Sequence, residues 1–308
     1  MKPPLVLPRE SPYNQAMIQE ILRPRTVPEA VRLKSRSRAA YLGGGTWLNA
    51  LESDELTTLI SLENLGLGTI ETARGRCIIG ATASLQQVVD APAVPPALRA
   101  AASLTCSRTL RNMKTIGGEL GRCVMDSTPA DSTPTYSADS APTYSADSAP
   151  TYSADSALIP VLIALNADIA LAGRKKPYPI EQFCNERPAD LALSVSVPSL
   201  PCAVRAVSRT SHSPRSLVVA VSCRDSLPVL IDVRVVVSDC RGQRVRLRDV
   251  ERTLEGSALP GKSLIEEAVG AAFAPTADIH ASSAYKRYLA GILVADALHV
   301  LASGKAAP

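Results

Sequence analysis

The chain has 308 residues, of which 46% are hydrophobic and 4% aromatic, and its formal net charge at pH 7 is +4. This length allows two or three modest domains with real hydrophobic cores, while the few aromatics and scattered basic residues argue against a nucleic-acid-binding surface. The seven cysteines lack the spacing of zinc or iron–sulfur ligands, so we expect reduced thiols. No apolar run is long enough to span a bilayer, and the proline-rich N-terminus does not resemble a signal peptide. We therefore expect a cytoplasmic protein.

The first predicted element is a short helix. The segment Thr26-Val27-Pro28-Glu29 has the spacing of a capping box, in which Thr26 accepts from the backbone and Glu29 reaches back. Ala30, Val31 and Leu33 then supply a short apolar face for this helix.

Strands and helices alternate along the rest of the chain. Strands are predicted at residues 39–42 and 59–62, a hairpin turning at Arg74-Gly75 at 69–81, a helix at 96–104, and a helix followed by a strand at 158–172. This pattern is typical of an α+β fold. The segment 109–120 carries the second double glycine of the chain.

Two glycine-rich segments, Gly43-Gly44-Gly45-Thr46 and Thr115-Ile116-Gly117-Gly118, are the candidate anion-binding elements. A glycine without Cβ lets backbone N–H groups approach an anion, and a nearby threonine adds a hydroxyl donor. A single such loop is usually a tight turn, whereas two of them favour a pyrophosphate gripped from two sides. Neither fits the dinucleotide pattern GxGxxG, because position six counted from Gly43 is Leu48.

A third segment, GSALPGKS at residues 256–263, satisfies the letters of a P-loop. A working P-loop follows a buried strand, but the preceding RLRDVERTLE is charged and predicted to be helical. Pro260 also removes one backbone donor. We therefore interpret this segment as a link between two helices.

Three segments carry a family resemblance: YLGGGTWLNAL at 41–51, SRTLRNMKTIGGEL at 107–120 and SSAYKRYLAGILVADAL at 282–298. Together they resemble the FAD-binding subunit of the molybdenum hydroxylases, which include the medium subunits of xanthine dehydrogenase and carbon monoxide dehydrogenase. The resemblance implies an α+β fold with two subdomains that hold FAD between them, followed by a C-terminal α+β domain. VVAVSC and VLIDVRVVVSDC fit the sheet of that last domain.

The domain boundaries that the resemblance implies are an N-terminal extension at 1–16, an FAD-binding domain at 17–200 and a C-terminal domain at 201–308. The FAD-binding domain would consist of subdomains at 17–73 and 74–200, with an insertion at 127–155.

Candidate FAD-binding residues follow by position. The resemblance places a first loop at Leu42, Gly43, Gly44, Gly45, Thr46 and Trp47, and a second loop at Thr115, Ile116, Gly117, Gly118 and Glu119. It also places Arg205, in a strand, where the family often has a lysine beside the flavin. A surface charge at a strand edge is the alternative for Arg205. Trp47, Glu119 and Ala157 stand where the family commonly has Asp, Asn and Asp. No catalytic residue and no metal ligand is assigned, since His212, His280 and His299 are isolated.

The sequence also predicts partners. It holds no cysteine pattern for a 2Fe–2S cluster and no molybdopterin domain. The resemblance therefore implies an iron–sulfur subunit that supplies electrons to FAD, a molybdopterin subunit, and NAD⁺ or another acceptor. Two alternatives remain: a self-contained FAD-dependent oxidase or reductase, and a non-catalytic scaffold that has lost its flavin.

An eight-residue unit repeats across residues 131–157, as DSTPTYSA, DSAPTYSA, DSAPTYSA and a truncated DSA. The units lack Leu, Ile and Val, so they cannot offset an ordering cost of about 1–2 kcal/mol per residue. Removing residues 127–155 restores the family spacing to Pro160, which indicates a solvent-exposed insertion.

Deletion of residues 127–155 is accordingly expected to leave a chain that folds and binds FAD at least as well as the parent. Absorbance near 450 nm of the purified variant checks this. Loss of flavin would mean that the repeat had become part of the site.

Overall fold

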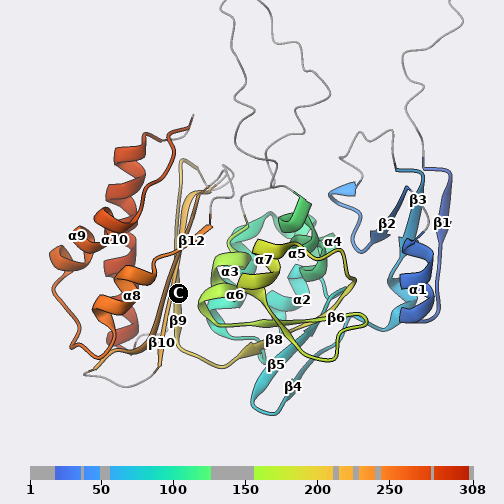
Figure 1. Ribbon diagram of the computed structural model, residues 1–308, viewed down its shortest axis with the longest axis horizontal. Coiled ribbons are helices and arrows are strands. Elements are labelled where there is room, and N and C mark those ends of the chain that lie inside the picture. Colours follow the sequence, from blue (N-terminus) through green and yellow to red (C-terminus); the bar gives the residue numbers. More distant parts are fainter. Residues whose placement is uncertain are drawn as a thin grey trace, which may run out of the picture.

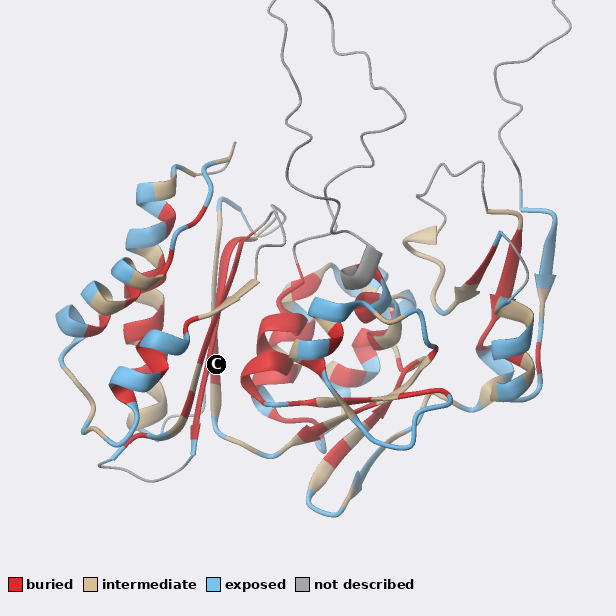
Figure 2. Ribbon diagram, viewed as in Figure 1, coloured by how far each residue is buried: buried red, intermediate tan, exposed pale blue. Residues whose placement is uncertain are grey.

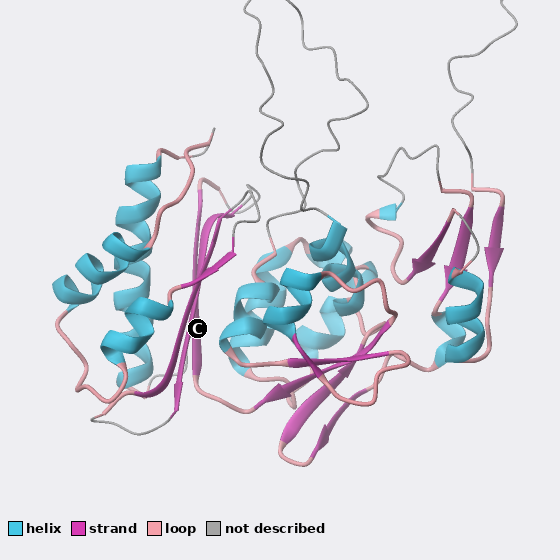
Figure 3. Cartoon of the chain, viewed as in Figure 1, coloured by secondary structure: helices cyan, strands magenta, loops and turns pink. Residues whose placement is uncertain are grey.

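The computed structural model describes residues 18–35, 38–48, 56–125, 156–210, 215–224, 229–239, 244–278 and 281–304 (Figure 1). The predicted N-terminal extension and repeat insertion lie outside these residues, as do His212 and His280. The described chain forms three sheets, each with its own helices (Figure 3). We refer to them as the N-terminal unit (18–65), the middle unit (70–198) and the C-terminal unit (202–304). This is the α+β fold that the sequence predicted.

The N-terminal unit is a parallel sheet of three strands in the order β1-β3-β2. Its elements are β1 (Glu20–Leu22), α1 (Val27–Lys34), β2 (Ala39–Leu42), β3 (Thr58–Ser61) and the short 3₁₀ turn η2 (Glu63–Leu65). Ala30 and Ile60 of its core pack with Ala172 and Leu191 of the middle unit, so the two units share apolar contacts.

Helix α1 begins with the predicted threonine cap, but Glu29 accepts from a different backbone N–H than predicted. Thr26 Oγ1 accepts from the N–H of Glu29 at 3.3 Å. The Glu29 carboxylate accepts from the N–H of Arg25 instead of Thr26, so the predicted capping box is wrong by one residue. The apolar face is also narrower than predicted, because Val31 is 42% exposed.

The middle unit is an antiparallel sheet of five strands in the order β4-β5-β8-β6-β7. Its strands are β4 (Ile70–Ala73), β5 (Arg76–Gly80), β6 (Asp168–Leu171), β7 (Tyr178–Pro179) and β8 (Ala192–Pro198). Its helices are α2 (Leu85–Asp90), α3 (Pro96–Thr105), α4 (Arg108–Met113), α5 (Ile116–Met125), α6 (Leu158–Ala164) and α7 (Ile180–Glu186).

The predicted hairpin forms at β4 and β5. Arg74 and Gly75 have φ angles of 52° and 71°, the left-handed pair that a two-residue hairpin loop requires. Strand β4 precedes the subdomain boundary expected at residues 73 and 74, yet it pairs with β5 in the middle sheet.

The C-terminal unit is an antiparallel sheet in the order β12-β11-β10-β9, followed by helices. Its elements are β9 (Cys202–Ser208), β10 (Arg215–Arg224), β11 (Ile231–Asp239), β12 (Arg244–Arg246), α8 (Arg248–Leu254), α9 (Lys262–Ala272) and α10 (Ser283–Ala302). The two β-branched segments lie in β10 and β11, as predicted. The P-loop-like segment joins α8 to α9, which confirms its interpretation as a link between helices.

Both faces of the C-terminal sheet are buried (Figure 2). Val218, Ala220 and Val236 pack with the middle unit, against helix α6, every residue of which is buried. Alternate residues such as Val219 face α9 and α10 on the other side. Ser222 Oγ donates to the carbonyl of Ala164 at 2.5 Å and fastens this sheet to the end of α6.

A buried lysine fixes α10 to the C-terminal sheet. The side chain of Lys286 is fully buried, and its Nζ lies 3.0 Å from Asp239 Oδ2 and 2.9 Å from the carbonyl of Thr276. Asp278 is a second carboxylate partner of the same Nζ. Burial alone would lower the pKa of Lys286, but the hydrogen bonds to Asp278 and Asp239 outweigh it and raise that pKa above its usual value.

Among the described residues there is no disulfide, no membrane-spanning helix and no metal-binding cluster. The five cysteines described with their side chains, Cys77, Cys106, Cys184, Cys202 and Cys223, form no disulfide. No described helix combines the length and apolar character that crossing a bilayer would require. No three described His, Cys, Asp or Glu side chains are grouped so as to hold a metal ion.

Candidate functional site

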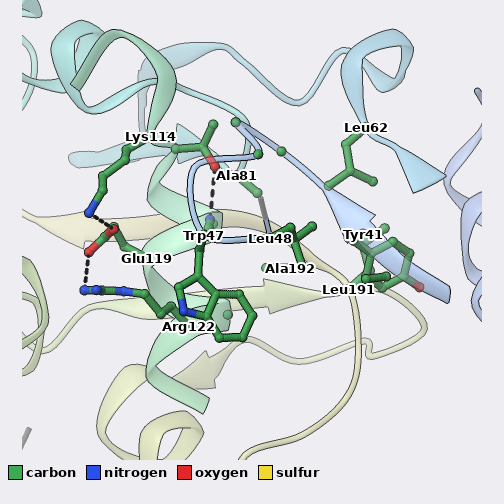
Figure 4. A pocket seen from close by; sticks show the side chains of 18 of the residues that line it. Tyr41, Trp47, Leu48, Leu62, Ala81, Lys114, Glu119, Arg122, Leu191 and Ala192 are labelled. Carbon is green, nitrogen blue, oxygen red and sulfur yellow. Dashed lines mark hydrogen bonds and ion pairs between the residues drawn. The ribbon is translucent and has the colours of Figure 1, made fainter. Parts of the chain in front are cut away.

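A cavity of ≈ 310 Å³ lies between the N-terminal and middle units (Figure 4). The N-terminal unit contributes the loop at residues 43–48, together with Lys34 and Tyr41. The middle unit contributes residues of the α4–α5 turn and of α5, and the segment 187–192 that leads into β8. The cavity therefore occupies the junction that the family resemblance implied for FAD.

The first glycine loop follows β2 and packs closely on the middle unit. The Leu42 carbonyl accepts from the N–H of Leu62 at 3.0 Å, which holds the end of the strand. A Cβ added to Gly44 would lie 1.6 Å from the Met113 carbonyl oxygen, so no other residue fits there. Gly45 has a φ of 71°, which also favours glycine. The loop is thus held backbone to backbone against the α4–α5 turn.

The amides of this loop are candidate donors to the cavity. Within the described part of the chain, no backbone–backbone hydrogen bond is donated by residues 43–48. These residues line the cavity, so their N–H groups can bind an anion there.

The second double glycine is not a loop, contrary to the prediction for residues 115–119. It forms the first turn of α5, after α4 has already ended at Met113. The N–H groups of Ile116 and Gly117 donate to the carbonyls of Ala83 and Ala81, at 3.0 and 2.8 Å. These two amides are therefore consumed inside the protein. Gly117 permits this contact, because an added Cβ would lie 2.6 Å from the Ala81 oxygen.

Thr115 is the donor that this segment offers to the cavity. Its Oγ1 accepts from the N–H of Gly118 at 3.0 Å and so caps α5. A hydroxyl that accepts one hydrogen bond still carries its own proton. Thr115 lines the cavity beside Gly43, whose added Cβ would lie 2.8 Å from this oxygen.

A buried carboxylate lies next to Thr115 between two cations. Glu119 is 4% exposed, with Lys114 Nζ at 3.2 Å and an Arg122 guanidinium nitrogen at 3.0 Å (Figure 4). These two ion pairs compensate the negative charge of Glu119, and the three side chains together keep one positive charge. Among the described residues, the cavity lining holds four basic side chains, Lys34, Lys114, Arg122 and Arg187, and two acidic ones, Glu119 and Asp190. This excess of positive charge suits a phosphate ligand.

Tyr41 and Trp47 give the cavity an aromatic wall. Burial, assisted by the charge of Asp190, raises the pKa of Tyr41, so its phenol stays protonated at neutral pH. Asp190 itself forms an ion pair with Arg174 at 2.8 Å. The indole of Trp47 faces the same space as Glu119 and Arg122 (Figure 4).

Most of the predicted site residues meet at this cavity. Those that line it are Gly43, Gly44, Gly45, Thr46, Trp47, Thr115, Gly117, Gly118 and Glu119. Leu42 is the last residue of β2, and Ile116 is fully buried in the core. Neither is part of the lining. Ala157, the third departure from the family pattern, is buried at the start of α6 and also lies outside the lining.

Arg205 lies elsewhere. It forms an ion pair with Asp296 of α10 at 2.7 Å. Its neighbour Val204 packs in the core shared with the middle unit, so strand alternation turns Arg205 toward the helices of the C-terminal unit. The structure does not bring it to the cavity lining.

Several lining residues were not predicted from the sequence: Lys34, Lys114, Gly121, Arg122, Arg187 and the residues 188–192. Gly121 could have been identified from the sequence, because it lies one helical turn after Gly118 and keeps the side chains on the same face of α5 small. The segment 187–192 carries no local pattern and reaches the cavity only through the fold.

The family model for the FAD-binding domain in molybdopterin dehydrogenase matches residues 16–200. The uncharacterized protein YgfM of Escherichia coli strain K12 is 32% identical over 287 residues, which cover 91% of this chain and 95% of YgfM.

Two solved structures have a similar fold. A chain of carbon monoxide dehydrogenase from Hydrogenophaga pseudoflava matches with a TM-score of 0.73 and 22% identity, covering 92% of this chain and 97% of that one. A chain of quinoline 2-oxidoreductase from Pseudomonas putida 86 matches with a TM-score of 0.74 and 16% identity, covering 93% and 97%.

Proposed function

Because the chain belongs to the family of FAD-binding domains of molybdopterin dehydrogenases, we propose that it holds FAD in the cavity between its N-terminal and middle units. The FAD pyrophosphate would lie against the amides of residues 43–48 and the hydroxyl of Thr115. The observation that carries this assignment is a set of loop amides that have no backbone acceptor within the described residues, at a cavity whose described lining has a net positive charge.

The residues present fit the cofactor. A pyrophosphate needs several hydrogen-bond donors and compensating positive charge, and the loop and the basic lining supply both. Gly44 leaves room only for backbone, which keeps the donors close to the α4–α5 turn. The contribution of the second glycine segment differs from the one first predicted. It consists of the Thr115 hydroxyl and of the close packing that Gly117 allows, rather than of a second row of free amides.

Replacement of Thr115 with valine tests this assignment. The variant removes the hydroxyl without changing the side-chain shape, so we expect FAD affinity to fall at least ~10-fold. Loss of the cap on Gly118 should also cost about 1 kcal/mol of stability. FAD titration of the apoprotein, followed by flavin fluorescence, measures the affinity.

Thr115→Ser is the matched control for this experiment. It keeps the hydroxyl and should bind FAD close to the parental level. Equal affinity of the valine variant and the parent would remove Thr115 from the site.

We further propose that the chain is the flavoprotein subunit of a molybdenum-containing hydroxylase or dehydrogenase. FAD, when bound, connects one-electron donors with two-electron acceptors. The part of this chain is to bind and orient that cofactor while a partner iron–sulfur subunit supplies electrons and NAD⁺ or another oxidant accepts them. Support comes from the family membership and from the lack of a cysteine pattern for a 2Fe–2S cluster.

Co-expression with the neighbouring genes tests this assembly. We expect a complex that co-purifies with iron, molybdenum and FAD, and whose flavin is reduced by substrate only when the partners are present. If the isolated chain turned over a substrate with its own flavin, the self-contained oxidase or reductase would be the better assignment. A colourless chain that still assembles would favour the scaffold.

A further inference from the structure

A second cavity, of ≈ 430 Å³, is lined by residues of α7 of the middle unit and of β11, β12 and α8 of the C-terminal unit. Among the described residues, four arginines line it, Arg187, Arg244, Arg246 and Arg248, against one acidic side chain, Glu181. The cavity is distinct from the candidate FAD site, and within the described chain Arg187 alone lines both.

The sequence Arg244-Val245-Arg246-Leu247-Arg248 explains this concentration of charge. Val245 and Leu247 pack with the core of the C-terminal unit. Because side chains alternate along a strand, Arg244 and Arg246 face the opposite side, toward the middle unit. The pairing of Arg246 with Val236 in β11, which also lines the cavity, confirms this direction.

The ion pairs described at this cavity involve Arg246 and Arg248. Glu181 accepts from Arg246 at 3.0 Å and from Arg248 at 2.6 Å. Partial burial alone would raise the pKa of Glu181, but these two hydrogen bonds outweigh it and hold that pKa below its usual value. Arg246 also reaches Glu251 at 2.9 Å. Among the described residues that line the cavity, Glu181 is the one fixed anion that a negative ligand would meet, while Glu251 compensates part of the charge of Arg246 from outside the lining.

Arg234 of β11 shows that positive charge is in excess here. Arg234 and Val236 are two residues apart in β11, so their side chains lie on the same face of the strand. Burial, followed by the charge of Arg246, lowers the pKa of Arg234. Its Nε is buried without a hydrogen-bond partner, and the nearest described carboxylate oxygen, Asp232 Oδ1, is 3.7 Å away.

We propose that this cavity binds a phosphate-bearing small molecule. The planar guanidinium group offers two parallel N–H donors that match two phosphate oxygens, which makes arginine the preferred residue for such groups. A concave site of this volume falls within the range of small-ligand pockets. The ligand would join the middle and C-terminal units, since Arg187 comes from one and Arg244, Arg246 and Arg248 from the other. This site is additional to the proposed FAD site.

Calorimetric titration of the FAD-saturated protein with pyrophosphate, at constant ionic strength, tests the proposal. FAD saturation keeps pyrophosphate out of the first cavity. We expect saturable binding of one ligand per chain, weakened at least ~10-fold in the double variant Arg244→Gln/Arg248→Gln. Arg187 is left unchanged, because it also lines the FAD cavity. Absence of saturable binding, or an unchanged affinity in the double variant, would overturn the proposal.

Two matched variants separate the site from general charge. Arg252→Gln removes the same charge from α8 at a position that is 79% exposed and should leave the affinity unchanged. Glu181→Gln removes the one lining anion and should tighten binding, an effect that loss of structure cannot produce. Weaker binding in Glu181→Gln would contradict the assignment.

Three ligands define the chemical class. ATP binding more tightly than pyrophosphate would identify a nucleotide, and equal affinities would identify the phosphate group alone. Citrate binding as tightly as pyrophosphate would show that the site does not select phosphate, and the proposal would then be wrong.

Discussion

Gly44→Ala should cost the protein most of its FAD. The added Cβ would lie 1.6 Å from the Met113 carbonyl oxygen and 2.6 Å from its carbon, and both are backbone atoms that no rotamer change can move aside. The loop at 43–48 must then shift away from Thr115 and separate the two groups of donors proposed for the pyrophosphate. We expect affinity for FAD to fall at least ~100-fold, which corresponds to about 2.7 kcal/mol. The ratio of absorbance at 450 and 280 nm, with FAD titration of the apoprotein, measures the loss.

The control for this variant is Gly261→Ala. An added Cβ at Gly261 would meet nothing within 4 Å, and this glycine does not line the cavity. The control should retain FAD, and circular dichroism should show both variants folded. A folded Gly44→Ala protein with parental flavin content would mean that the loop does not hold the cofactor.

The second large effect is expected at Lys286. Lys286→Met leaves the carboxylates of Asp239 and Asp278 buried beside an apolar side chain, at exposures of 0% and 8%. Removal of one partner from a buried ion pair typically costs about 3–5 kcal/mol. We therefore expect a marked fall in the urea concentration that unfolds the C-terminal unit, followed by far-ultraviolet circular dichroism and limited proteolysis.

Two further variants test whether charge burial causes this loss. Lys262→Met changes an exposed lysine at the start of α9 and should alter stability by less than about 0.5 kcal/mol. Asp239→Asn/Lys286→Met removes one of the stranded charges and should be more stable than the sum of the two single changes predicts. Strict additivity of the two would argue against a coupled buried cluster.

The pH dependence of the Lys286 contribution follows from its raised pKa. A lysine whose pKa is higher in the folded than in the unfolded state stabilises the fold fully below the unfolded value. The stabilisation disappears as the pH rises through the folded pKa, which lies above the usual 10.5. The difference between parent and Lys286→Met should therefore stay constant around neutral pH and shrink only under strongly alkaline conditions.

The sequence predicted those elements whose signals are local. The turn at Arg74-Gly75, the cap at Thr26 and the β-branched runs of β10 and β11 each depend on a few neighbouring residues, and each was found close to its predicted place. The pairing of the two glycine segments at one cavity was also foreseen, because both carry a threonine beside a double glycine.

Contacts between distant segments could not be predicted in this way. The amides of Ile116 and Gly117 are consumed by the carbonyls of Ala83 and Ala81, which no pattern near residue 116 reveals. The direction of Arg205 depends on which face of β9 meets the middle unit, and that requires the neighbouring layers. The arginine cavity likewise needs β12 to lie opposite α7.

The burial of the C-terminal sheet on both faces limits how hybrid proteins can be made from two relatives. A crossover at residue 200 between two relatives would keep every strand pair intact, yet it would replace one half of the contact between α6 and β10–β11. Val218, Ala220 and Val236 are at most 3% exposed at that contact, and close-packed interiors respond to the change of a single methylene. A viable hybrid would therefore have to inherit Val218, Ala220 and Val236 together with the helix they cover.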